Sequence, residues 1–132
     1  MPTSLPAASI SPVVWIGSSQ ADLRAFPEDV RDTMGFALYV AQTGGKHPAA
    51  KPLTGDTAFR GAGVLEIVDD FDGDAYRAVY TVRFQGFVYV LHAFQKKSRR
   101  GIATPKADIE RIKTRLKAAR EHYEELIKRQ AR

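Results

Sequence analysis

The sequence predicts an α+β fold in which a small antiparallel sheet, arranged as a meander, packs on helices and is followed by a long C-terminal helix. Apolar runs typical of strands occupy residues 64–94 and are separated by short turn sequences. Apolar residues then recur at steps of three and four between Ile109 and Leu126, which is the spacing of one helix face. At 132 residues the chain has the length of one domain with a single modest core.

The composition is that of a folded protein and excludes several kinds of site. Apolar residues make up 44% and charged residues 27% of the chain. Without cysteine the chain has neither disulfides nor a Cys-based zinc site, and its three histidines lack metal-ligand spacing. We therefore expect no metal and no cofactor. No apolar run approaches the roughly 18 residues that span a bilayer, and the N-terminus lacks the pattern of a signal peptide. We expect a cytoplasmic protein without a membrane partner.

The first third of the chain is predicted to contain a disordered lead-in, a strand and a helix. Residues 1–12 are rich in Pro, Ser and Ala, so we expect the domain to occupy residues 13–132. The run VVWI (13–16) suits a short strand, and a polar stretch follows it. Pro27 suits the first turn of a helix, and Gly44 with Gly45 ends the run. The apolar positions between them have helical spacing: Val30, Met34, Ala37, Leu38 and Ala41.

A long loop over residues 46–63 precedes the predicted meander. The runs VLEIVDDF and DAYRAVYTVRF flank Asp72-Gly73, a dipeptide that closes tight hairpins. The chain then continues through Gln85-Gly86 into a third strand that ends at LHAF. Alternation predicts one face with Tyr76, Ala78, Tyr80, Val82 and Phe84, and the other with Arg77, Val79, Thr81 and Arg83. Thr104 is the expected N-cap of the last helix, with Pro105 in its first turn.

The positive charge of the chain is concentrated in one region. The net charge is +5, yet residues 95–120 hold ten of the twenty Lys and Arg residues and only two acids, Asp108 and Glu110. This segment carries +8, and the remainder carries −3. Such an asymmetry favours a polyanionic partner, nucleic acid first among them. A solvated helix face is the alternative interpretation of a charge run.

Five short sequences occur in an order that resembles a known toxin family: KPLTG, VLEI, AYRAVY, LHAFQKKS and TPKADIERIKTRL. Together they resemble the phage-derived RelE/HigB-type toxins of the RelE/ParE superfamily, over about residues 13–120. The resemblance implies a RelE-like fold and a metal-independent endoribonuclease that cleaves messenger RNA on the ribosome and so inhibits translation. It also implies a type II toxin–antitoxin system, in which a cognate antitoxin, usually a helix-turn-helix protein, inhibits the toxin.

The resemblance also implies which residues form the site. Metal-free RNA cleavage needs a base for the 2′-hydroxyl, cations for the developing charge and an acid for the leaving oxygen. Arg77 is expected to stabilise the phosphate, and Lys96 and Lys97 to be the basic residues that end the following strand. His92 is a further catalytic candidate because it lies close before them. Further RNA contacts are expected from Lys51, Arg99, Arg100 and Lys113.

Two departures from the RelE pattern leave the acid–base chemistry open. The strand before Arg77 carries acids where RelE has lysines, and SRRGIATP contains no tyrosine. A base would then come from His47, His92 or Glu66, and Glu66 could instead be an ion-pair partner of Arg77. Two other functions therefore stay open: a ParE-like non-catalytic inhibitor of DNA gyrase, and a plain nucleic-acid-binding module.

Overall fold

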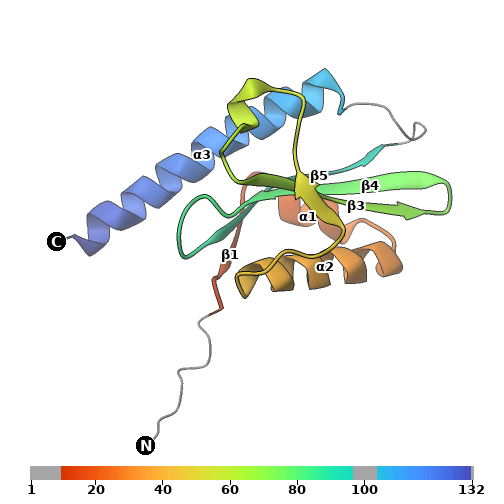
Figure 1. Cartoon of the computed structure of the whole chain (residues 1–132), viewed down its shortest axis with the longest axis horizontal. Helices are drawn as coiled ribbons and strands as arrows, with labels where there is room; N and C mark the ends of the chain where they lie inside the picture. The colour runs from red at the N-terminus through yellow and green to blue at the C-terminus, as the bar shows by residue number, and fades with distance from the viewer. Residues whose placement is uncertain (1–9, 97–103, 132) are drawn as a thin grey trace, which may run out of the picture.

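The computed structural model of the protein describes residues 10–96 and 104–131 (Figure 1). Within them, five strands form one sheet in the order β1-β5-β4-β3-β2. The strands are β1 (Val13–Trp15), β2 (Ala50–Pro52), β3 (Val64–Phe71), β4 (Asp74–Thr81) and β5 (Val88–Lys96). The helices are α1 (Ser19–Arg24), α2 (Glu28–Gln42) and α3 (Lys106–Gln130), with a short 3-10 helix, η1 (Thr57–Phe59). The predicted α+β class with a long C-terminal helix is confirmed.

The meander is present, but the sheet is mixed rather than antiparallel. Strands β3, β4 and β5 pair antiparallel in chain order, and β2 adds to β3 in the same sense. Strand β1 instead pairs parallel with β5, with Val13 opposite Val88. Local turn signals predict hairpins between consecutive strands. They contain no information on a strand that pairs with a segment far along the chain.

Three local predictions were wrong. Helix α1 forms in the stretch that reads as polar, where Ser19 and Leu23 are buried. The predicted long loop contains β2 and η1, and the Asp56 side chain caps η1 by accepting from the Ala58 N–H. Thr104 is not the N-cap of α3. The helix begins at Lys106 because Pro105 has an extended ψ of 147°, and no side chain caps this end.

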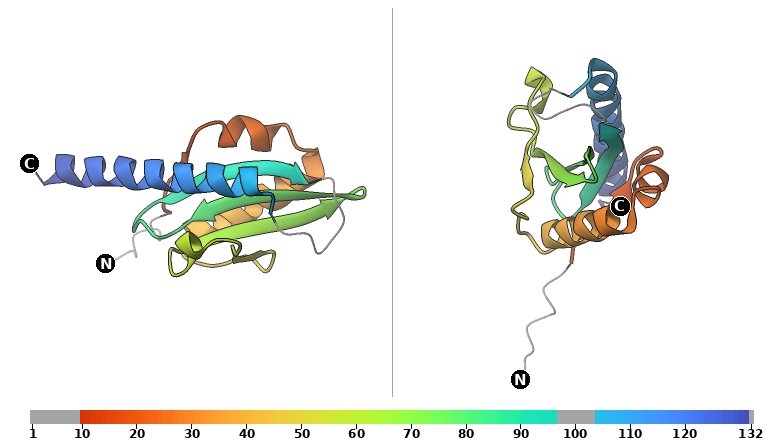
Figure 2. Two further views of the ribbon diagram at one scale, coloured as in Figure 1. Left: turned by 90° about the horizontal axis from the view of Figure 1, so that it is seen from above. Right: turned by 90° about the vertical axis from the view of Figure 1, so that its right-hand side faces the viewer.

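Two hydrophobic layers flank the sheet, because α2 covers one face and α3 the other (Figures 1 and 2). Tyr76, Ala78 and Tyr80 pack in the α2 layer, and Val79 packs in the α3 layer, as the alternation predicts. The alternation fails after Thr81 because β4 ends there. Val82 is 42% exposed, and Phe84 packs in the α3 layer rather than with Tyr76.

A bulge in β5 changes which side chains face α3. Val79 pairs with His92, but the next residue, Tyr80, pairs with Val90, so Leu91 has no partner in β4. Leu91 packs in the α3 layer, and His92 contacts Asp108 of α3. Two consecutive residues of β5 therefore lie on the same face of the sheet.

Part of the segment that was expected to be disordered is hydrogen-bonded to the domain. The Ser11 N–H donates to the Gln42 carbonyl at 3.0 Å, and the Val88 N–H donates to the Pro12 carbonyl at 3.0 Å. These two hydrogen bonds hold Ser11 and Pro12 against the domain, just before the predicted start at Val13. Residues 1–9 lie outside the described residues. No helix in the described part of the chain is long and apolar enough to cross a membrane.

Gly17, at the turn between β1 and α1, supplies the first testable prediction. Its φ is +58°, and a Cβ there would lie 2.8 Å from the Arg115 guanidinium carbon. Gly17→Ala should displace a guanidinium that bonds Ser18 and the Leu91 carbonyl. We expect a loss of about 1–2 kcal/mol in the free energy of unfolding beyond that of Gly61→Ala, measured by urea denaturation.

Gly61→Ala is the matched control because Gly61 has a φ of +66° and open space around its Cβ position. Gly61→Ala therefore introduces the strain of an alanine at positive φ, but its Cβ atom contacts no side chain. Equal losses in the two variants would contradict a structural role for the Arg115 contacts.

Candidate functional site

The register of the sheet brings charged residues from three strands onto the face that α3 covers. Glu66 lies opposite Val79, and Val79 lies opposite His92. Arg77 lies opposite Phe94, and Lys96 follows two residues later on β5. Asp108, in the first turn of α3, lies above this part of the sheet and contacts His92. The group is called the polar cluster below and consists of Glu66, Arg77, His92, Lys96 and Asp108.

An ion pair between Glu66 and Arg77 forms the centre of the polar cluster. The Arg77 Nη1 atom donates to the Glu66 Oε1 atom across neighbouring strands. The side chains are only 14% (Arg77) and 6% (Glu66) exposed, so the pair is largely removed from water. The Arg77 Nε atom is buried and has no hydrogen-bond partner among the described residues. A buried donor without a partner costs about 1–3 kcal/mol, so the pair alone does not satisfy this guanidinium.

Lys96 is a second cation that is held close to Arg77. It is 5% exposed. Burial lowers the pKa of Lys96, and the charge of Arg77 lowers it further, whereas Glu66 and Asp108 act in the opposite direction. The carboxylate of Glu66 therefore lies near two cations from adjacent strands. Asp108 is a second carboxylate that acts on Lys96, so the polar cluster holds two cations, Arg77 and Lys96, and two carboxylates.

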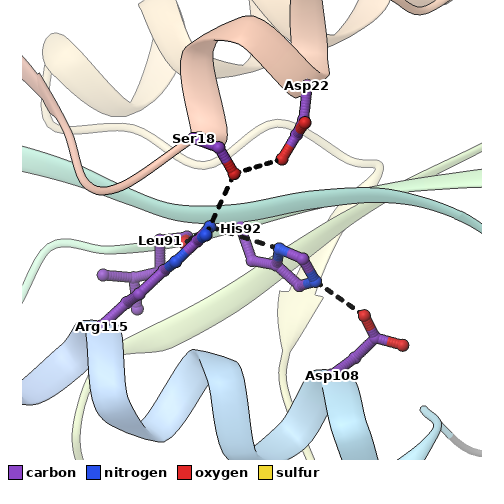
Figure 3. A network of polar contacts seen from close by, with 6 residues as sticks. All are labelled: Ser18, Asp22, Leu91, His92, Asp108 and Arg115. Atoms are coloured by element: carbon purple, nitrogen blue, oxygen red, sulfur yellow. Dashed lines mark hydrogen bonds and ion pairs between the residues drawn. The ribbon is translucent and has the colours of Figure 1, made fainter.

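His92 is held in one tautomer by partners on both ring nitrogens (Figure 3). Its Nδ1 atom faces the Arg115 Nη1 atom at 3.5 Å, and an arginine can only donate. The proton is therefore on Nε2, which donates to Asp108 Oδ1 at 2.7 Å. Burial lowers the pKa of His92, Asp108 opposes this shift, and Arg115 and Arg111 add to it. His92 is thus neutral, buried and fixed, and its ring stacks on Phe94 at 4.8 Å.

Arg115 connects α3 to both β5 and α1. Its Nη1 atom donates to the Leu91 carbonyl at 3.0 Å, and its Nη2 atom donates to Ser18 Oγ at 3.0 Å. Ser18 Oγ in turn donates to Asp22 Oδ2 at 2.7 Å (Figure 3). The Leu91 carbonyl belongs to the bulged residue. Arg115 thereby anchors three elements around the position of His92.

The remaining predicted site residues lie at different distances from the polar cluster. Lys51 is exposed on β2 directly opposite Glu66, so it shares the face of the cluster. Lys113 pairs with Asp56 at 3.3 Å and with Glu110 at 3.6 Å, and the hydrogen bond that it donates to Asp56 raises the pKa of Lys113. The predicted residues Lys97, Arg99 and Arg100 lie outside the described residues.

His47 does not join the polar cluster. Its Nδ1 atom accepts from the Ala49 N–H at 2.9 Å, and its ring packs edge-on against Phe36 of α2. It is therefore on the α2 side of the sheet. Of the three candidate bases, the structure brings Glu66 and His92 close to Arg77.

Two residues of the site, Asp108 and Arg115, were not among the predicted site residues. Asp108 is sixteen positions from His92, and no spacing rule connects a strand residue to a helix residue. One signal was available, because Asp108 and Arg115 are seven apart and so lie on one face of α3. The apolar stripe of α3, which includes Ile109 and Ile112, packs against the sheet and so determines where the face with Asp108 and Arg115 points.

The cluster has the groups for phosphate binding and proton transfer but no carboxylate–imidazole set for a metal. Arg77 and Lys96 can stabilise negative charge, and Glu66 can accept a proton. In the described part of the chain, no three His, Cys, Asp or Glu side chains gather where they could hold a metal ion.

Comparison with known proteins identifies one family. A family model described as "Phage derived protein Gp49-like" matches residues 21–117, which is well over half of the chain. No curated protein and no solved structure gives a significant match. The matched range contains the whole polar cluster and Arg115.

The environment of His92 predicts a pH dependence of stability. Because the folded chain holds the pKa of His92 below the ordinary 6.5, the unfolded chain binds a proton that the folded chain does not. The free energy of unfolding should be at its full value above about pH 6.5 and should fall as the pH is lowered towards the folded pKa. His92→Gln should flatten this fall, as measured by denaturation across pH.

A second variant separates the causes of the pKa shift of His92. Asp108→Asn removes the carboxylate that opposes the lowering, so the fall should extend to lower pH. If His92→Gln kept the wild-type pH profile, the buried neutral histidine would be refuted.

Proposed function

The chain belongs to the phage-derived Gp49-like protein family, and we propose that it is the toxin of a toxin–antitoxin pair that cleaves messenger RNA on the ribosome. The five sequences that resemble the RelE/HigB-type toxins support this proposal. VLEI lies on β3, AYRAVY on β4, and the part of LHAFQKKS up to Lys96 on β5. The toxin would inhibit translation in the cytoplasm and would be neutralised by a helix-turn-helix antitoxin.

One observation carries the proposal: Arg77 and Lys96 lie close together on neighbouring strands beside Glu66, on the face that α3 covers. Burial lowers the pKa of Lys96, and the charge of Arg77 lowers it further. The buried Arg77 Nε has no hydrogen-bond partner among the described residues. A phosphate that approaches the pair would contact both cations, which rigid strands hold in place.

The proposed reaction uses three side chains of the cluster. Arg77 exchanges part of its contact with Glu66 for a phosphate oxygen, and Glu66 then accepts the proton of the 2′-hydroxyl. The 2′-oxygen attacks the adjacent phosphorus, and the bond from phosphorus to the 5′-oxygen breaks. Lys96, whose lowered pKa makes it a better acid, donates a proton to the leaving 5′-oxygen. The products are a 2′,3′-cyclic phosphate and a 5′-hydroxyl.

In this scheme His92 positions Asp108 and the start of α3 over the site. Both ring nitrogens have partners, so the prediction of direct acid–base chemistry by His92 requires one contact to open. Because both ring nitrogens of His92 are engaged in contacts, the structure also favours the second candidate function, a ParE-like inhibitor of DNA gyrase that binds without catalysis. The two candidates differ in whether transcripts are cut.

Arg77→Ala tests the catalytic assignment. Removal of a charge stabiliser should lower the rate of message cleavage by about 10²–10³. Cleavage is measured by primer extension on translated transcripts after expression without a partner. Arg120→Ala is the control, because Arg120 is exposed on α3 and distant from the cluster in sequence, and it should keep the wild-type cleavage.

Stability measurements on the same variants separate catalysis from structure. Arg77→Lys keeps a cation near Glu66 but loses the guanidinium geometry, so it should fold and still cleave poorly. A folded Arg77→Ala protein with wild-type toxicity would refute the assignment. Intact messages together with blocked DNA supercoiling would select the gyrase function.

A further inference from the structure

A groove between α1, α2 and β1 lies on the α2 side of the sheet, away from the polar cluster. Its volume is about 340 Å³. Apolar side chains form its floor, and arginines lie at its rim: Val13, Trp15, Leu23, Leu38, Arg24 and Arg31. Trp15 is half-buried, and Leu23 and Leu38 are almost fully buried. The groove thus combines a firm apolar floor with positive charge.

Gly35 gives the groove an unusual wall. It lies in the middle of α2, where glycine is a poor helix former. A Cβ built at Gly35 meets no atom within 4 Å, so packing inside this chain does not require a glycine. The backbone of α2 is therefore bare at the surface of the groove. This geometry allows the backbone of another molecule to approach closely.

Both charged residues that line the groove are arginines. Arg24 and Arg31 are exposed, and in the described part of the chain neither forms an ion pair. Among the described residues no carboxylate lines the groove itself; Glu28 lies one turn before Arg31 on α2. One turn after Gly35, Tyr39 is 48% exposed, and the neighbouring Phe36 is 57% exposed. Apolar surface on α2 therefore continues beyond the groove.

We propose that this groove binds an amphipathic helix of a partner protein, with apolar residues on one face and Asp or Glu beside them. The apolar face would contact Trp15 and Leu38, the helix backbone would approach Gly35, and the carboxylates would pair with Arg24 and Arg31. The inference uses no residue of the polar cluster, so it stands apart from RNA cleavage.

A second copy of this chain is the competing occupant. One exposed apolar helix end that it could bring is that of α3, which projects beyond the sheet (Figure 2) and carries Ile127 at 46% exposure. Lys128 and Arg129 follow Ile127 directly, whereas Glu124 and Glu125 precede it. The charge of this end is therefore mixed, and it complements Arg24 and Arg31 less well than a helix that carries only Asp or Glu beside its apolar face.

A selection experiment tests the proposal. A displayed library of helical peptides is selected on the full chain, with counter-selection on Gly35→Trp, which fills the bare wall. We expect enriched peptides to carry apolar residues at helical spacing beside Asp or Glu. Synthetic copies should change the fluorescence of Trp15, the only tryptophan of the chain. Their affinity should fall at least about tenfold for Arg31→Glu.

The controls distinguish the groove from other surfaces. Arg120→Glu changes the net charge equally but lies on α3, and it should keep the affinity. Gly35→Ala should raise the melting temperature of the free chain, which shows that the glycine does not serve the fold. Any of three results of the selection overturns the proposal: no enrichment, enriched peptides without acidic residues, or peptides that bind Gly35→Trp as tightly as the wild type. Self-association that Ile127→Glu abolishes would overturn it in favour of a second copy.

Discussion

The buried ion pair between Glu66 and Arg77 is the interaction on which the α3 face of the sheet depends. Both side chains are largely buried, so each charge is compensated by the other. Removal of one partner of a buried pair typically costs about 3–5 kcal/mol, because the remaining charge is left uncompensated. Glu66 also offsets the burial of Lys96. The structural ion pair and the proposed phosphate site therefore share the same residues.

The contact of α3 with β5, beside this pair, follows from the bulge in β5. The extra residue, Leu91, allows its own side chain to pack in the α3 layer while His92 contacts Asp108. It also leaves the Leu91 carbonyl for Arg115. These polar contacts join helix α3 to β5 beside its apolar stripe. A regular strand would direct the side chain of either Leu91 or His92 to the opposite face.

Local patterns predicted most of the fold. The hairpin dipeptide Asp72-Gly73 and the alternation of β4 fixed the meander, and the spacing of three and four fixed α2 and α3. The Glu66–Arg77 ion pair was foreseen as the alternative to a role of Glu66 as base, and the structure forms it. Helix α1 was not foreseen, since only Ser19 and Leu23 are buried and such a short helix has no periodic signal.

Three further unpredicted features are non-local. The parallel pairing of β1 with β5, the bulge at Leu91 and the contact of His92 with Asp108 join segments whose sequence spacing carries no signal. The ion pair of Lys113 with Asp56 is a non-local contact of the same kind. Sequence patterns therefore predicted single strands and helices better than contacts between elements.

The most direct measurement follows the Arg77 Nε–H signal by nuclear magnetic resonance while a 2′-O-methyl RNA oligonucleotide, which cannot be cleaved, is added. In the described part of the chain this buried atom has no hydrogen-bond partner. The account predicts that its signal, assigned with Arg77→Lys, shifts to saturation as a phosphate oxygen accepts from it, while the signal of exposed Arg120 stays in place. An Arg77 signal that does not move when the oligonucleotide is bound would contradict a phosphate site at the polar cluster.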